Sequence, residues 1–270
     1  MRKTFVSLTL ALLAPVAAAQ AAGPTANGYL CQVMPSEKVE LASPISGVLD
    51  KISADRGDHV SEGQVVATLR SDVERVEVEL AEAKAGSSAQ VKGREAKLAF
   101  ADRRIARNSE LAQNNVISAN DMDGIRTERD MAAEDLGVAR DNQKIAQIEL
   151  RKAHAILDLH TMRSPISGVV TERRLSPGDL VRDQPVMVIQ KVDPLHVEVA
   201  LPLDMMAQVK KGVPAQISFD VPGVAPVTAA VSLADPVVEP TSNTFGVRID
   251  VPNPRMSIPS GIKCHVQFNQ

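Results

Sequence analysis

The sequence predicts an elongated α+β protein of several modules: a β sandwich in two halves, a long antiparallel α-helical (coiled-coil) hairpin inserted between the halves, and a small antiparallel β-barrel. Three observations support this. A six-residue string recurs 121 residues later, the segment between the copies lacks proline and has heptad spacing, and hydrophobicity alternates with period two beyond the second copy. The predicted segments are a signal peptide (1–21), an N-terminal strand joining the barrel (22–40), sandwich half 1 (41–70), the hairpin (71–161), sandwich half 2 (162–191) and the barrel (192–270).

The sandwich prediction rests on the repeat. Ser-Pro-Ile-Ser-Gly-Val begins at Ser43 and again at Ser164, and ten of the 23 positions in residues 43–65 are identical at the same offset. Each copy contains short strands and a Gly-Asp turn, at Gly57 and at Gly178, where glycine accepts positive φ. Because one copy is too small to bury its own apolar face, we expect the two copies to face each other in a two-layer sandwich.

The hairpin prediction rests on residues 72–161, which are rich in strong helix formers. Apolar residues and alanines recur at seven-residue spacing in both halves, and the break falls near Asn114 and Asn115. The predicted arms, 72–113 and 118–160, are nearly equal in length, which indicates an antiparallel pair, each arm extending roughly 60 Å. Ser118 is placed to cap the second arm, and the glycine and serines at 86–88, together with Gly93, predict a bend or frayed stretch in the first.

The barrel prediction rests on alternating strands after residue 192, with one short helix expected around residues 204–210. A candidate strand near the N-terminus places Tyr29, Cys31 and Val33 on one face and is a further member of the barrel. The only two cysteines, Cys31 and Cys264, lie on the apolar faces of the first and last barrel strands. We hypothesise a disulfide between them; two buried free thiols are the alternative.

The N-terminus predicts export. Arg2 and Lys3 precede an apolar run over residues 5–19 that is short for a membrane span, and small residues fit cleavage after Ala19 or Ala21. An uncleaved anchor is the alternative. The mature chain is therefore expected in an exported, oxidising compartment.

Composition excludes several functions. With a net charge of −3, no long basic run, and six aromatic residues in 270, the chain does not resemble a nucleic-acid-binding protein. No hydrolase elbow or zinc-protease motif is present, and the five histidines are scattered. Met205 and Met206 point in different directions on a short helix and are interpreted as core, not as metal ligands. The sequence therefore predicts no catalytic residue, no metal site and no cofactor.

The order of these modules resembles the periplasmic adaptor subunits, or membrane fusion proteins, of the HlyD type, including those of resistance-nodulation-division-like systems. The residues carrying the resemblance are the two Ser-Pro-Ile-Ser-Gly copies, the hairpin between them, and the segment from Asp193 to Val199 that opens the barrel. The halves also resemble lipoyl domains, but the hairpin occupies the turn where such domains carry a modified lysine, so a covalent carrier role is set aside. The chain ends at Gln270, after the last barrel strand, so we expect the membrane-proximal domain of many adaptors to be missing or rudimentary.

The resemblance implies a function and a site. Such adaptors link an inner-membrane pump to a TolC-type outer-membrane channel, self-associate commonly as hexamers, and reside in the periplasm against the inner membrane. Channel-binding members carry an Arg, a Leu four residues later and a Ser seven after that, a spacing matched by Arg107, Leu111 and Ser118. A structural role is the alternative, in which Leu111 is hairpin core, Arg107 a solvated charge and Ser118 only a cap. The alternative function is a periplasmic coiled-coil scaffold without a transport role.

Overall fold

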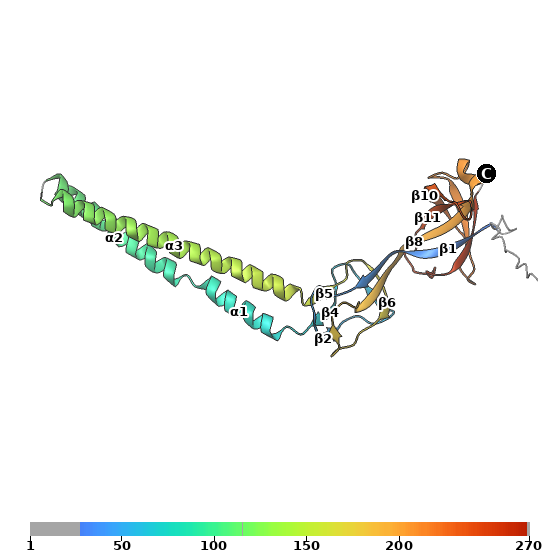
Figure 1. Ribbon diagram of the computed structural model, residues 1–270, viewed down its shortest axis with the longest axis horizontal. Coiled ribbons are helices and arrows are strands. Elements are labelled where there is room, and N and C mark those ends of the chain that lie inside the picture. The colour runs from blue at the N-terminus through green and yellow to red at the C-terminus, as the bar shows by residue number, and fades with distance from the viewer. Residues whose placement is uncertain (1–27, 115, 269–270) are drawn as a thin grey trace, which may run out of the picture. The chain divides into compact units, whose positions relative to one another are not determined.

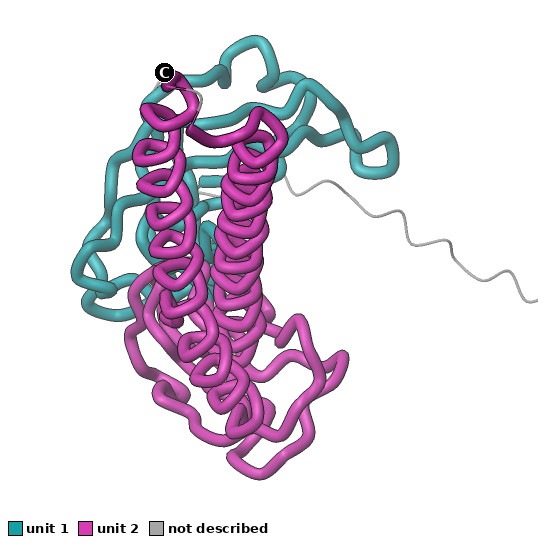
Figure 2. Tube along the Cα trace, turned by 90° about the vertical axis from the view of Figure 1, so that its left-hand side faces the viewer, with its two compact units in different colours: residues 1–38, 190–270 teal, residues 39–189 magenta. Residues whose placement is uncertain are grey.

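The computed structural model describes residues 28–114 and 116–268. The chain divides into two compact units, Met1–Lys38 with Gln190–Gln270, called here the barrel unit, and Val39–Ile189, called the sandwich–hairpin unit (Figure 2). Strands β1 (Tyr29–Leu41) and β8 (Met187–Pro202) contribute residues to both. The signal-peptide interpretation falls on residues outside the described range.

The sandwich is built from short strands of both repeat copies. The first copy supplies β2 (Gly47–Ile52), β3 (His59–Val60) and β4 (Val65–Leu69), and the second supplies β6 (Gly168–Arg173) and β7 (Leu180–Val181), with β5 (Thr161–Arg163) just before it. The copies exchange strands, because β2 pairs with β7 and β3 pairs with β6, both antiparallel. Neither half therefore completes its sheet alone, as the repeat predicts.

The sandwich core collects one apolar face from each copy. Its fully buried members include Leu49, Val66 and Leu69 from the first copy and Val170 and Val181 from the second. The buried Ser164 is satisfied locally, since its hydroxyl donates to the Ile166 carbonyl at 2.6 Å. The equivalent Ser43 repeats this bond to the Ile45 carbonyl at 2.7 Å.

Three helices form the hairpin: α1 (Asp72–Gly86), α2 (Ala89–Gln113) and α3 (Ala119–Asp158) (Figure 1). The first arm is thus two helices, where a bend or frayed stretch was expected. Ser87 takes an extended ψ of 105°, and Ser88 forms no side-chain cap, so the chain leaves helical geometry at these serines. Gly93 stays within α2, so only one of the two weak points breaks the helix.

Packing between the arms follows the expected small and apolar positions. The buried face of α3 comprises Met122, Ile125, Ala132, Leu136 and Ala139. The end view in Figure 2 shows the two arms lying side by side along their length. Ion pairs between exposed side chains also connect the two arms. They include Arg129 with Asp102 at 3.0 Å and Arg140 with Glu95 at 3.0 Å.

The barrel unit closes a ring of strands. The remaining elements are β9 (Pro214–Phe219), β10 (Val227–Glu239), β11 (Thr244–Val251) and β12 (Lys263–Phe268). The strand order is β1-β12-β9-β10-β11-β8, and a further pairing of β1 with β8 closes it. The expected helix around 204–210 is instead a short 3₁₀ helix, η1 (Leu203–Ala207), and Gly212, at a φ of 93°, lies in the turn before β9.

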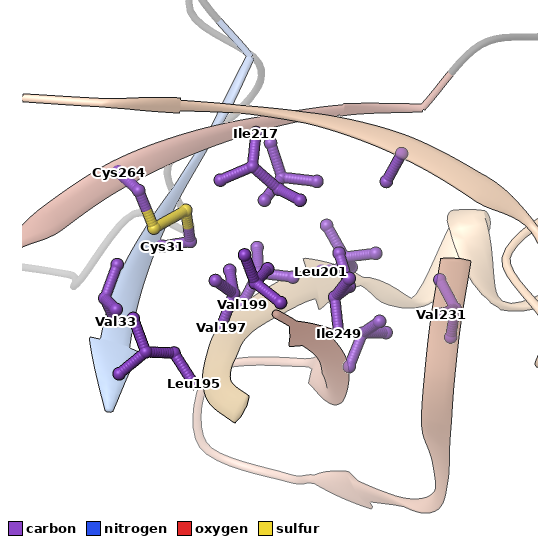
Figure 3. Close-up of a cluster of buried hydrophobic side chains, with 14 of the residues drawn as sticks. Cys31, Val33, Leu195, Val197, Val199, Leu201, Ile217, Val231, Ile249 and Cys264 are labelled. Carbon is purple, nitrogen blue, oxygen red and sulfur yellow. A yellow bond between two sulfur atoms is a disulfide. The ribbon is translucent and has the colours of Figure 1, made fainter. Parts of the chain in front are cut away.

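Alternating residues of these strands fill the barrel interior (Figure 3). Leu195, Val197, Leu201, Ile217 and Ile249 are fully buried there. Cys31 on β1 lies opposite Cys264 on β12, and their sulfur atoms are bonded. The disulfide therefore joins the first strand of the barrel to the last. From the sequence, both this disulfide and two buried free thiols were possible.

Candidate functional site

The tip of the hairpin is the candidate site, since it carries the three residues that the sequence singled out. Arg107 and Leu111 lie one helical turn apart on α2, and Ser118 precedes α3. Residues four apart share a helix face, so Arg107 and Leu111 belong to one surface. Asn115, between the arms, lies outside the described residues.

Ser118 is the N-cap of α3. Its hydroxyl accepts a hydrogen bond from the backbone N–H of Asp121 at 3.1 Å and donates to the Asp121 carboxylate at 2.7 Å. The cap satisfies one of the amides left free at a helix start, and Asp121 places negative charge beside the positive end of the helix dipole. Ser118 therefore fixes where the return helix begins, while remaining exposed.

Leu111 is 41% exposed, so it is not a member of the hairpin core. Its carbonyl accepts a hydrogen bond from the Val116 N–H at 2.9 Å, which folds the turn back over the end of α2. Val116 is 67% exposed, so two apolar side chains are presented to solvent at the tip. Sequence reasoning missed Val116, although an apolar residue within a polar turn is a signal that could have found it.

Arg107 is exposed on the same helix. Within residues 28–114 and 116–268, no hydrogen bond or ion pair of its side chain is present, in contrast to Arg104, which pairs with Glu128 of α3. The ion pair of Arg104 with Glu128 therefore connects the two arms near the tip, whereas the Arg107 side chain is directed to solvent. In the described part of the tip, the exposed Arg107 therefore lies near two exposed apolar side chains, Leu111 and Val116, and the capped start of α3.

The rest of the described chain offers little chemistry. No group of three or more His, Cys, Asp or Glu side chains that could hold a metal ion occurs in residues 28–114 and 116–268. Over the same ranges, no helix combines the length and the apolar character needed to cross a membrane. Four surface groups have shifted pKa values. A hydrogen bond from the backbone N–H of Arg56 lowers the pKa of Asp55, and hydrogen bonding to Lys97 lowers that of Asp135. Hydrogen bonds to Asp102 and to Glu172 raise the pKa of Arg129 and of Arg174.

Family models match both units. The model of the CzcB-like barrel-sandwich hybrid domain matches residues 37–190, and the model of the CusB-like β-barrel domain matches residues 194–270. The order of sandwich, hairpin and barrel is the fold of the membrane fusion proteins. Because the first match covers more than half of the chain, the protein belongs to this family of membrane fusion proteins, the periplasmic adaptors.

Individual relatives agree with the assignment. Multidrug resistance protein MdtE of Escherichia coli strain K12 is 24% identical over 251 residues, which cover 86% of this chain. The chain spans 60% of the length of that relative. The fold resembles MacA from Actinobacillus actinomycetemcomitans, with a TM-score of 0.75 and 20% identity, covering 88% of this chain and 76% of MacA. It also resembles the membrane fusion protein Spr0693 from Streptococcus pneumoniae R6, with a TM-score of 0.58 and 22% identity, covering 89% and 97%.

Proposed function

We propose that this protein is a periplasmic adaptor that links an inner-membrane transporter to a TolC-type outer-membrane channel for efflux or secretion. The exposed tip carries the proposal, with Arg107, Leu111 and Ser118 as the channel-binding residues. Membership of the membrane fusion protein family supports it, as does the name of MdtE, which describes multidrug resistance in that relative.

The proposed mechanism is geometric and not catalytic. The coiled-coil hairpin provides length, because the 40 residues of α3 span roughly 60 Å at 1.5 Å per residue. The tip engages the channel, while the sandwich and barrel contact the transporter and neighbouring copies. The protein is exported by its signal peptide, works in the periplasm beside the inner membrane, and assembles with copies of itself, with six as the expected number.

In-cell photocrosslinking from Leu111 tests the proposal. A photoreactive side chain at this position should give an adduct that contains an outer-membrane channel protein. The same side chain at Leu80, which is exposed at the other end of the first arm, is the matched control and should give no channel adduct. Adducts only with further copies of this chain, with the fold intact, would favour the periplasmic scaffold instead.

A charge reversal tests the same surface by function. Arg107→Asp should abolish efflux or export, because a cation that faces a partner becomes an anion, whereas an exposed charge reversal changes stability by less than about 0.5 kcal/mol. Arg151→Asp on α3 is the control, since this residue is also exposed but far from the tip. Unchanged efflux with Arg107→Asp would count against the tip as the docking site.

A further inference from the structure

The barrel unit has a groove on its outer wall whose polar groups the adaptor function does not use. The groove has a volume of about 460 Å³ and crosses four neighbouring strands, β1, β8, β11 and β10. Its lining residues on β8 and β11 alternate with residues that are buried in the barrel interior, so they lie on the outer face. The volume is within the range of about 300–1,000 Å³ that is typical of sites for small molecules. The argument below uses these lining residues: Glu198, Ala200, Leu233, Asp235, Gly246 and Arg248.

A bulge in β10 places Asp235 in this groove. Between its pairs with Val247 and with Phe245 of β11, β10 contains three residues, whereas β11 contains only Gly246. Bulges redirect side chains and are common beside functional sites. The Asp235 carboxylate lies over Gly246, because a methyl group at position 246 would overlap its Oδ2 atom. Glycine therefore leaves the space that the carboxylate occupies.

Arg248 provides the opposite charge on the same face of β11. It follows Gly246 by two residues, which separates the two Cα atoms by about 7 Å. Its Nη2 donates to Glu198 Oε1 at 3.0 Å, whereas its Nη1 has no hydrogen-bond partner among the described residues. Within residues 28–114 and 116–268, its Nε is the one buried side-chain nitrogen or oxygen atom that lacks a hydrogen-bond partner. Such an atom costs free energy unless a water molecule or a ligand satisfies it.

Asp235 and Arg248 do not satisfy each other. No ion pair joins them, and the Asp235 carboxylate has no hydrogen-bond or ion-pair partner in the described part of the chain. Asp235 is exposed and 40% of the Arg248 side chain is exposed, so a solute can reach both. Leu233 beside them is 42% exposed, and Ala200 pairs in register with Gly246, which gives the groove a floor of small residues. The groove therefore combines an acceptor, a donor and an apolar surface.

We propose that this groove binds a small zwitterion, an α-amino acid with an apolar side chain. The ammonium group of the ligand donates to the Asp235 carboxylate, its carboxylate accepts from the Arg248 guanidinium, and its side chain lies against Leu233. A simple cation would leave the free donors of Arg248 unused, and a simple anion would be repelled by the carboxylates of Asp235 and Glu198. An α-amino acid carries both charges close together and satisfies both groups. This inference goes beyond the proposed adaptor function, because it assigns a ligand site that uses no residue of the tip.

Nuclear magnetic resonance of the full chain, with ¹⁵N only in glycine, tests the proposal with leucine as the probe. Gly246 is the one glycine among the lining residues, and its amide signal is identified by its absence from the Gly246→Ala spectrum. Leucine should shift this signal saturably and leave the signal of Gly137, within α3, unchanged. Leucine amide lacks the carboxylate, and N-acetylleucine lacks the ammonium group. Each should bind about tenfold more weakly or worse, because each loses a charge-assisted hydrogen bond.

Variants test the two charged contacts separately. Asp235→Asn and Arg248→Gln should each weaken leucine binding by about tenfold or more. Asp204→Asn is the matched control, since this aspartate is exposed on η1 outside the groove, and it should leave binding unchanged.

The comparison of the three ligands does not depend on the folding of any variant. The proposal would be overturned by the lack of a saturable shift of the Gly246 signal, or by equal binding of leucine and either analogue. Unchanged binding by Asp235→Asn or Arg248→Gln would overturn it too. Leucine binding and crosslinking from Leu111 are separate measurements, so either proposal can fail without the other.

Discussion

The backbone N–H of Gly57 donates a hydrogen bond of 2.8 Å to the carbonyl of Val170, in the other half of the sandwich. At the repeat offset, the N–H of Gly178 donates to the carbonyl of Leu49 at 2.7 Å. The two bonds are the same contact made twice, once by each copy. Each glycine turn therefore joins its own copy to the other, and the sandwich depends on both.

Both turns require positive φ. Gly57 has a φ of 93° and Gly178 a φ of 95°, and a Cβ at either position would meet no atom within 4 Å. We expect Gly178→Val to lower the unfolding free energy by about 1–2 kcal/mol, because an L side chain in this region is strained even where space is open. The midpoint of urea unfolding measures the change.

A helical glycine gives the matched control. Gly137 lies exposed within α3, and a Cβ there also meets no atom within 4 Å. Gly137→Ala should stabilise the chain by about 0.5–1 kcal/mol, since the helix gains a better former. If Gly178→Val leaves the midpoint unchanged, the positive-φ argument for the turn is wrong.

The disulfide between Cys31 and Cys264 should contribute to the stability of the folded chain. Cys31 and Cys264 are both buried, and they are separated by 233 positions in the sequence. Their joint replacement by alanine should lower the unfolding free energy by about 2–5 kcal/mol, mainly through the unfolded chain. Thiol titration of the unfolded, unreduced protein should find no reactive thiol, and two reactive thiols would show that the cysteines are free.

Asn253 should be the most sensitive polar residue of the barrel unit. It is 2% exposed, and its side-chain amide donates to the carbonyls of Val192 at 3.0 Å and Ile258 at 2.9 Å. Its side-chain oxygen accepts from the Ile258 N–H at 3.1 Å. Asn253→Ala would leave these buried groups unpaired, at a cost of about 2–3 kcal/mol or more in unfolding free energy. Asn142→Ala, at an exposed position of α3, should change stability little.

Acid should weaken one connection between the hairpin arms. Lys97 and Arg94 hold the pKa of Asp135 below its ordinary value of 3.8, Lys97 through a hydrogen bond of 2.9 Å. Because the folded pKa is the lower one, this stabilisation is complete above the unfolded pKa and is lost as the pH falls through the folded value. Asp135→Asn should therefore lower the melting temperature slightly at pH 7, and this loss should shrink as the pH falls below 3.8. An equal loss above and below this pH would mean that the carboxylate charge contributes nothing.

Much of the architecture could be predicted from local patterns. A six-residue identity at a fixed offset is visible without coordinates, and so are the heptads of the hairpin, because both follow from how a strand or helix presents its side chains. The cap at Ser118 is equally local, since a capping hydroxyl contacts its own helix. The break at Ser87 and Ser88 was only partly predictable, because Gly93 looks as weak and yet stays helical.

Other features depend on contacts between distant residues. Sequence alone determined the order of modules, the candidate tip and the family resemblance, because each of them follows from residue types and their spacing along the chain. Only the tertiary structure decided that Leu111 is exposed, that Cys31 faces Cys264, and that Asn253 closes a buried network with Val192. The physical reason is that the exposure of a side chain, the partner of a cysteine and the hydrogen bonds of a buried amide all depend on residues that are distant in sequence. The spacing of residues within one helix or strand does not show which distant residues will become neighbours on folding.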